Sequence, residues 1–87
     1  MRKVVFSPKA LEELSRFKTG NQKLVFKLLE LLADIQKNPF TGLGKPEPLT
    51  ANFSGYWSRR INDEHRLIYR ITNESIEILS CYGHYEQ

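Results

Sequence analysis

The fold depends first on the stretch WSRRINDEHRLIY, at residues 57–69. It predicts two β-strands joined by a short turn, because aromatic and branched apolar residues flank the polar triplet NDE at residues 62–64. Three arginines, Arg59, Arg60 and Arg66, would stand on these two strands. The planar guanidinium of arginine offers several donors that fit the oxygens of a phosphate group. A rigid hairpin carrying them is therefore a candidate anion-binding surface.

The segments around this hairpin predict an α+β fold. Residues 2–6 are expected to form a strand, and Ser7 and Pro8 suit the N-cap and the first position of a helix. Leucines at helical spacing predict a second helix over residues 21–37, which Asn38 and Pro39 end. A last strand is expected over residues 75–82. The expected architecture is an N-terminal strand and a two-helix hairpin, packed on a mainly antiparallel four-stranded sheet.

The length and composition favour a single domain spanning residues 1–87, with a net charge of +3. That charge favours polyanionic partners but does not prove them. Cys81 is the only cysteine, so no disulfide framework is expected, which fits a reducing cytoplasm. Cys81 is interpreted as a buried strand residue rather than a nucleophile. The sequence predicts no signal peptide, membrane span, metal site or cofactor.

A long segment rich in proline and glycine, residues 39–54, separates the second helix from the hairpin. Long connections inside small domains are often functional. Pro46 and Pro48 flank Glu47 and would limit the movement of its carboxylate, which would suit a catalytic group. The alternative is that Glu47 is a solvated loop acid, and the spacing alone does not choose between the two.

The chain carries the groups needed to cleave RNA without a metal ion. A base must take a proton from the ribose 2′-hydroxyl, an acid must protonate the leaving 5′-oxygen, and a cation must stabilise the charge on phosphorus. Glu47, His84 and Arg66 could fill these roles, and Tyr85 could stack on an unpaired base. This set is sufficient but not diagnostic. No nucleophile elbow, phosphate-binding loop or acidic cluster for two metals is present.

Four sequence motifs, taken in their order along the chain, allow a far more specific prediction than these catalytic groups alone. They are GKPEPL at residues 44–49, SGYWSRRI at residues 54–61, EHRLIY at residues 64–69, and the pair His84-Tyr85. Together they resemble the YoeB/Txe family of bacterial toxins, within the RelE-like superfamily. The resemblance covers essentially the whole chain.

The resemblance implies the toxin of a type II toxin–antitoxin pair, acting as a ribosome-dependent mRNA endonuclease, or mRNA interferase. Members of this family cut mRNA in the ribosomal A site by attack of the 2′-hydroxyl, without a metal. The matching motifs imply that Glu47 corresponds to the general base of the family and that Arg66 corresponds to the arginine that stabilises its transition state. The acid and the terminal tyrosine fall on His84 and Tyr85.

The resemblance also implies RNA contacts and partners. Lys45 and Arg60 match basic positions that contact RNA, whereas Arg59 and His65 match positions that either bind ribosomal RNA or are structural. The implied partners are a YefM/Axe-type antitoxin that wraps the toxin, the 70S ribosome with its mRNA, and a second copy in a homodimer. A cytoplasmic protein without cofactor, metal or membrane contact is expected.

Two other functions remain open from the sequence. One is a non-catalytic module that binds RNA or the ribosome and inhibits translation by occupancy alone. The other is an interaction domain that acts mainly with its antitoxin in a repressor complex.

Overall fold

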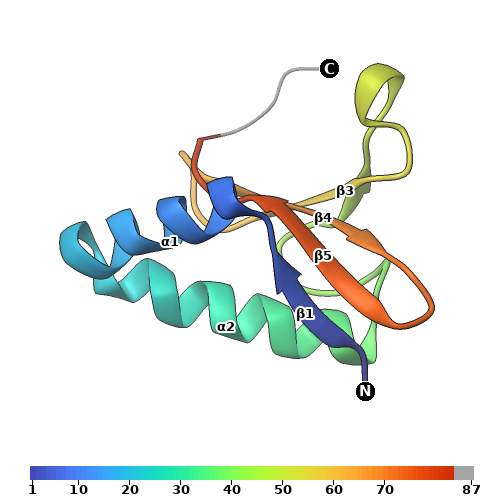
Figure 1. The fold of residues 1–87 in the computed structure, drawn as a ribbon, viewed down its shortest axis with the longest axis horizontal. Helices are drawn as coiled ribbons and strands as arrows, with labels where there is room; N and C mark the ends of the chain where they lie inside the picture. The colour runs from blue at the N-terminus through green and yellow to red at the C-terminus, as the bar shows by residue number, and fades with distance from the viewer. Residues whose placement is uncertain (84–87) are drawn as a thin grey trace.

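The computed structural model describes residues 1–83, and Figure 1 shows how their helices and strands are arranged. In chain order the elements are β1 (Lys3–Phe6), α1 (Pro8–Gly20), α2 (Gln22–Lys37), β2 (Glu47–Pro48), a 3₁₀ turn (Ala51–Phe53), β3 (Trp57–Arg60), β4 (Arg66–Ile71) and β5 (Ser75–Ser80). The predicted α+β class, the helical hairpin and the three sequential C-terminal strands are confirmed.

Within the described residues the sheet has five strands, in the order β1-β5-β4-β3-β2. The pairs β2–β3, β3–β4 and β4–β5 are antiparallel, whereas β1 lies parallel to β5 at one edge of the sheet. The predicted count of four strands was one too low, because the segment containing Glu47 and Pro48 pairs with β3 as a two-residue strand. Its prolines lack the N–H that a central strand needs, so this segment is suited only to the edge of the sheet.

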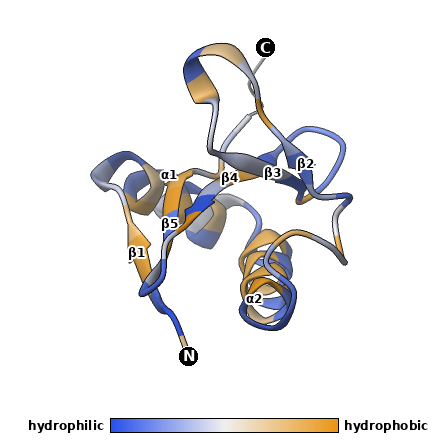
Figure 2. Ribbon diagram, turned by 90° about the vertical axis from the view of Figure 1, so that its right-hand side faces the viewer, coloured by the Kyte–Doolittle hydropathy of each residue, from blue (hydrophilic) through white to orange (hydrophobic). Residues whose placement is uncertain are grey.

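The helices cover one face of the sheet through an apolar core. The side-chain oxygen of Ser7 accepts a hydrogen bond from the Ala10 amide (3.0 Å), as expected of an N-cap. Figure 2 shows α2 below the strands β3 and β4. The buried core joins residues of α1, α2, β4 and β5, among them Phe17, Leu28, Leu31, Ile35, Leu67, Tyr69, Ile76 and Ile78. The hairpin predicted at residues 57–69 thus lies with one face on this core and leaves the other face for function.

None of the helices within residues 1–83 is long and apolar enough to cross a membrane.

Cys81 lies buried just after β5, as expected, next to a carboxylate. Its backbone amide donates a hydrogen bond to Glu13 Oε1 (2.9 Å), and its thiol has no exposed surface. Burial, with a smaller contribution from the negative charge of Glu13, raises the pKa of Cys81 to about 12. The thiol is therefore protonated at neutral pH, and the protonated form is a poor nucleophile.

We expect Cys81 to react with a thiol reagent at pH 8 about a thousandfold more slowly in the folded protein than in denaturant, because the thiolate population differs by about that factor. Since Cys81 is the only cysteine, absorbance from a thiol–disulfide reagent reports this group alone. Labelling in native buffer as fast as in denaturant would contradict the buried environment.

Candidate active site

Strand alternation separates the two faces of the hairpin. Arg59 points toward α2, where it bonds Asp34, so its neighbours Ser58 and Arg60 belong to the opposite face. The register places Arg66 opposite Arg60, and Glu47 of β2 opposite Ser58. We call this side, which carries Glu47, Ser58, Arg60 and Arg66, the outer face of the sheet.

The outer face brings the predicted base and the predicted transition-state cation to either side of one serine. Arg66 Nη1 donates a hydrogen bond to Ser58 Oγ (3.1 Å), so its guanidinium leans diagonally across β3 toward β2. Glu47 occupies the position beside Ser58 on that strand and is exposed to solvent. A phosphodiester could therefore meet a carboxylate and a guanidinium at the same place.

Ser58 was not singled out from the sequence. It is 2% exposed, and its hydroxyl orients the Arg66 side chain. The available signal was the alternation of β3, which places the small polar residue Ser58 on the same side of the strand as Arg60.

The segment carrying Glu47 is fastened to β3 at both ends. The Arg60 amide donates to the Gly44 carbonyl (2.7 Å), and the Leu49 amide donates to the Tyr56 carbonyl (2.9 Å). Gly44 has a φ of +77°, and a Cβ there would lie 2.8 Å from the Arg60 carbonyl oxygen. Only glycine allows this close approach without strain. The motif at residues 44–49 therefore serves to hold one carboxylate on the outer face.

A basic depression lies beside this segment. Its volume is about 270 Å³, and its lining residues are Lys27, Gly44, Lys45, Arg60, Ile61 and Asn62. Lys45 is exposed, and the half-buried Arg60 forms an ion pair with Asp63. The structure thus brings together the two cations predicted to contact RNA. It adds Lys27 of α2, which the sequence gave no reason to choose and which also pairs with Glu30 (3.2 Å).

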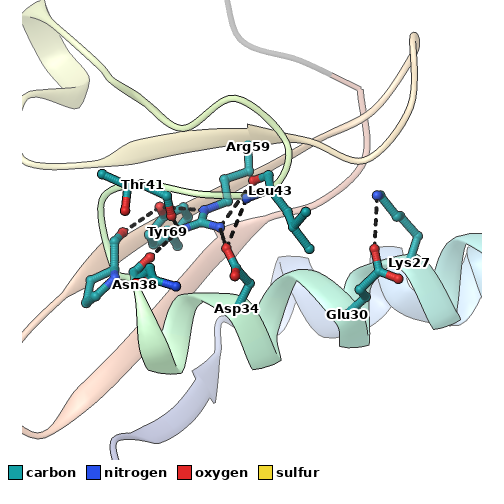
Figure 3. A network of polar contacts seen from close by, with 9 residues as sticks. Lys27, Glu30, Asp34, Asn38, Thr41, Leu43, Arg59 and Tyr69 are labelled. Carbon is teal, nitrogen blue, oxygen red and sulfur yellow. Dashed lines mark hydrogen bonds and ion pairs between the residues drawn. The ribbon is translucent and has the colours of Figure 1, made fainter.

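Arg59 has the structural role that the sequence had left open. Its side chain has no exposed surface. Each of its five N–H donors meets an acceptor, and Figure 3 shows the network. The acceptors are the Asp34 carboxylate (2.6 Å), the Tyr69 hydroxyl (3.0 Å) and the carbonyls of Leu43 (3.1 Å), Asn38 (2.5 Å) and Thr41 (2.8 Å).

This network attaches the chain after α2 to the sheet. The hydrogen bond from Arg59 is the main cause that lowers the pKa of Asp34 below its usual value, so the carboxylate stays ionised. Tyr69 extends the network by donating its hydroxyl to the Pro39 carbonyl (2.8 Å). With every donor occupied inside the protein, Arg59 has none to offer RNA.

His65 is buried as well, at 5% exposed. Its Nδ1 accepts a hydrogen bond from the Gly83 amide (2.8 Å), and its ring packs on Phe17 and Tyr82. His65 therefore supports the fold from inside the protein and does not present its ring to RNA.

The predicted acid His84 and the predicted tyrosine Tyr85 lie outside the described residues. The description ends at Gly83, whose carbonyl accepts a hydrogen bond from the Arg66 amide (2.8 Å). Among residues 1–83 there is no cluster of three or more His, Cys, Asp or Glu side chains that could hold a metal ion.

Comparison with solved structures first defines the class of protein. The fold matches that of YafQ from Escherichia coli, with a TM-score of 0.76 over 97% of this chain and 94% of that chain, at 17% identity. At this identity the match concerns the fold alone, which is that of the RelE-like toxins. The YoeB dimer of Staphylococcus aureus is much more similar, with a TM-score of 0.91 and 46% identity over 97% of this chain and 98% of that chain.

The sequence relatives define the family. The toxin YoeB of Mycobacterium bovis is 45% identical over 98% of this chain and all of its own length, and that of E. coli K12 is 42% identical over 95% and 99%. The family model described as "YoeB-like toxin of bacterial type II toxin-antitoxin system" matches residues 6–85. The chain belongs to this family, which confirms the resemblance read from the four motifs.

Proposed function

We propose that this toxin is a ribosome-dependent mRNA endonuclease. The observation that carries the proposal is the arrangement on the outer face, where Arg66 bonds Ser58 and Glu47 stands beside the same serine. Only a carboxylate that is open to solvent can reach a bound nucleotide, and Glu47 is exposed at the sheet edge.

In the proposed reaction the ribose 2′-oxygen attacks the adjacent phosphorus, and the bond from phosphorus to the 5′-oxygen breaks. Glu47 accepts the proton of the 2′-hydroxyl, and Arg66 stabilises the negative charge that grows on the phosphoryl oxygens. His84 donates a proton to the leaving 5′-oxygen, and Tyr85 orients the nucleotide. The products are a 2′,3′-cyclic phosphate and a 5′-hydroxyl, and no metal ion takes part.

The basic depression gives this site a means of holding RNA. Lys45 stands two positions before Glu47, and Arg60 stands two positions after Ser58, the β3 partner of Glu47. An RNA phosphate bound in this depression would therefore let the RNA strand continue across the outer face. We assign these two residues to RNA binding. We assign Arg59 and His65 to the support of the fold.

The partners follow from the relatives. Structures from S. aureus are described as a YoeB–YefM complex, 46% identical with a TM-score of 0.89, and as a YoeB dimer. We propose that this chain likewise binds a YefM/Axe-type antitoxin and forms a homodimer, and that it acts in the cytoplasm on the 70S ribosome and its mRNA.

Primer extension on a defined mRNA with translating ribosomes tests the activity. Adding the toxin should create new 5′ ends at the A-site codon, and these ends should carry a hydroxyl. Arrested translation without new ends would favour inhibition by occupancy and would remove the catalytic assignments. A neutralising antitoxin added at equal concentration is the control, and it should suppress the new ends.

Replacing Arg66 by alanine should lower the cleavage rate by about 100- to 1,000-fold, the usual effect of removing one group that stabilises an anionic transition state. Arg70→Ala is the matched control, because Arg70 stands on the same strand but pairs with Glu77 (2.6 Å) instead of Ser58. Single-turnover cleavage on ribosomes measures both rates. Equal losses in the two variants would mean that general charge, not Arg66, matters.

A further inference from the structure

Two hydrogen bonds from neighbouring residues converge on Gly83. The Gly83 amide donates to Nδ1 of His65, and the Gly83 carbonyl accepts from the Arg66 amide, each at 2.8 Å. His65 directly precedes β4 and Arg66 is its first residue, whereas Gly83 follows β5. Both polar backbone groups of Gly83 are therefore held by the start of the strand that carries the Arg66 guanidinium.

The His65 ring, which accepts the hydrogen bond from the Gly83 amide, is held rigidly. The His65 ring is 5.0 Å from the ring of Phe17 and 4.5 Å from that of Tyr82, between centroids. Its Nε2 lies 3.5 Å from the Glu64 carboxylate. Because Nδ1 accepts a hydrogen bond, the hydrogen-bond pattern assigns the proton of the neutral ring to Nε2. A buried imidazole packed against two aromatic rings has little freedom to move away from the Gly83 amide.

The held residue is also a turning point of the chain. Gly83 has a φ of +71°, in the left-handed region that favours glycine, although a Cβ there would meet no atom of residues 1–83 within 4 Å. Glycine is thus required by the backbone conformation and not by crowding. The two hydrogen bonds therefore fix a turn whose direction the sequence alone does not reveal.

We infer that His65 is a positioning residue for the terminal segment that carries His84 and Tyr85. Together with the Arg66 amide it forms a clamp that holds Gly83, the residue directly before this segment, to the residue that carries the active-site guanidinium. Consecutive Cα atoms are about 3.8 Å apart, so a fixed residue 83 strongly limits the reach of residue 84. This inference rests on the proposed function, in which His84 is the acid and Arg66 the stabilising cation of one reaction.

A matched pair of substitutions separates the hydrogen bond from the packing. His65→Asn keeps an acceptor where Nδ1 lies but removes the ring, whereas His65→Phe keeps a ring but removes the acceptor. We expect His65→Phe to lower the single-turnover cleavage rate about 100-fold, the scale of a misplacement of about 1 Å. The ribosome concentration for half-maximal rate should not change, and His65→Asn should retain most of the activity. Parental activity in His65→Phe, or an equal loss in both variants, would overturn the clamp.

A second readout does not depend on cleavage. Hydrogen exchange of the Gly83 amide, followed by NMR, should be slow in the parent and in His65→Asn and fast in His65→Phe. An unprotected amide in the parent would overturn the clamp even if RNA is cut. Protection without any cleavage by the parent would instead refute the proposed function and so remove the catalytic purpose of the clamp.

Gly83→Ala provides a test that leaves the core untouched. Within the described part of the chain a Cβ at this position meets no atom within 4 Å, so the variant should fold, but the positive φ is unfavourable for alanine and should loosen the turn. We expect the cleavage rate to fall while the thermal midpoint stays near that of the parent. A parental cleavage rate would show that the turn does not position the terminal segment.

Discussion

Replacing Glu47 by glutamine is expected to lower the rate of mRNA cleavage by about 100- to 10,000-fold, because positioned general bases contribute on that scale. Glutamine has nearly the same shape, but its amide cannot accept a proton from the 2′-hydroxyl. Glu47 is exposed on the edge strand β2, so the substitution leaves no buried group unpaired and should not alter stability. Single-turnover primer extension with saturating toxin measures the chemical step, and binding to the ribosome is measured separately by sedimentation.

Glu74→Gln is the matched control for Glu47→Gln. Glu74 is also an exposed glutamate, but it lies in the turn between β4 and β5, beyond the end of β4 that is away from Arg66. The control changes the net charge by the same amount and should cleave at the parental rate. Parental cleavage by Glu47→Gln would exclude Glu47 as the base and would leave it the solvated loop acid that the sequence also allowed.

Replacing Arg59 by methionine is expected to lower the free energy of unfolding by about 3–5 kcal/mol, the usual cost of removing one partner of a buried ion pair. The loss leaves the Asp34 carboxylate and three backbone carbonyls without their donor in a partly buried place. The whole free energy of unfolding of a chain this long is about 4–13 kcal/mol, so a large fraction of it would disappear. Urea unfolding followed by the fluorescence of Trp57, the only tryptophan, measures the change.

Arg16→Met is the control for the stability prediction. Arg16 also pairs with a carboxylate, Glu12 (3.1 Å), but the two side chains are 56% and 60% exposed. Exposed pairs of this kind contribute about 0.5 kcal/mol or less. If Arg59→Met unfolds at the same urea concentration as Arg16→Met, the network in Figure 3 does not fasten the chain after α2 to the sheet.

The two arginines of β3 show what strand periodicity could and could not predict. Alternation places neighbouring residues such as Arg59 and Arg60 on opposite faces of a strand, but it does not say which face packs against a helix. The structure puts Arg59 toward α2, because Asp34 and the carbonyls after that helix meet four of its five donors there, and Tyr69 meets the fifth. The acceptors come from residues 10 to 25 positions away in sequence, so no local pattern could identify them.

The segment at residues 39–54 shows a different limit. Its prolines and glycines indicated a long irregular connection, and most of it is one, but Glu47 and Pro48 pair with β3 as an edge strand. Two residues are too few to give an alternation signal. The pairing depends on the approach of Gly44 to Arg60, which only a folded chain brings about.

By itself the sequence determined the α+β class, the helical hairpin and the three consecutive strands, because these depend on local periodicity, helix caps and turn residues. Its motifs also determined the family, and the resemblance they carry predicts Glu47 and Arg66 as members of one active site. Only the tertiary structure decided that Ser58 lies between those two residues, and that Arg59 and His65 are buried. The physical reason is that burial and hydrogen-bond partners depend on strand register and on contacts between distant segments, which local sequence preferences do not specify.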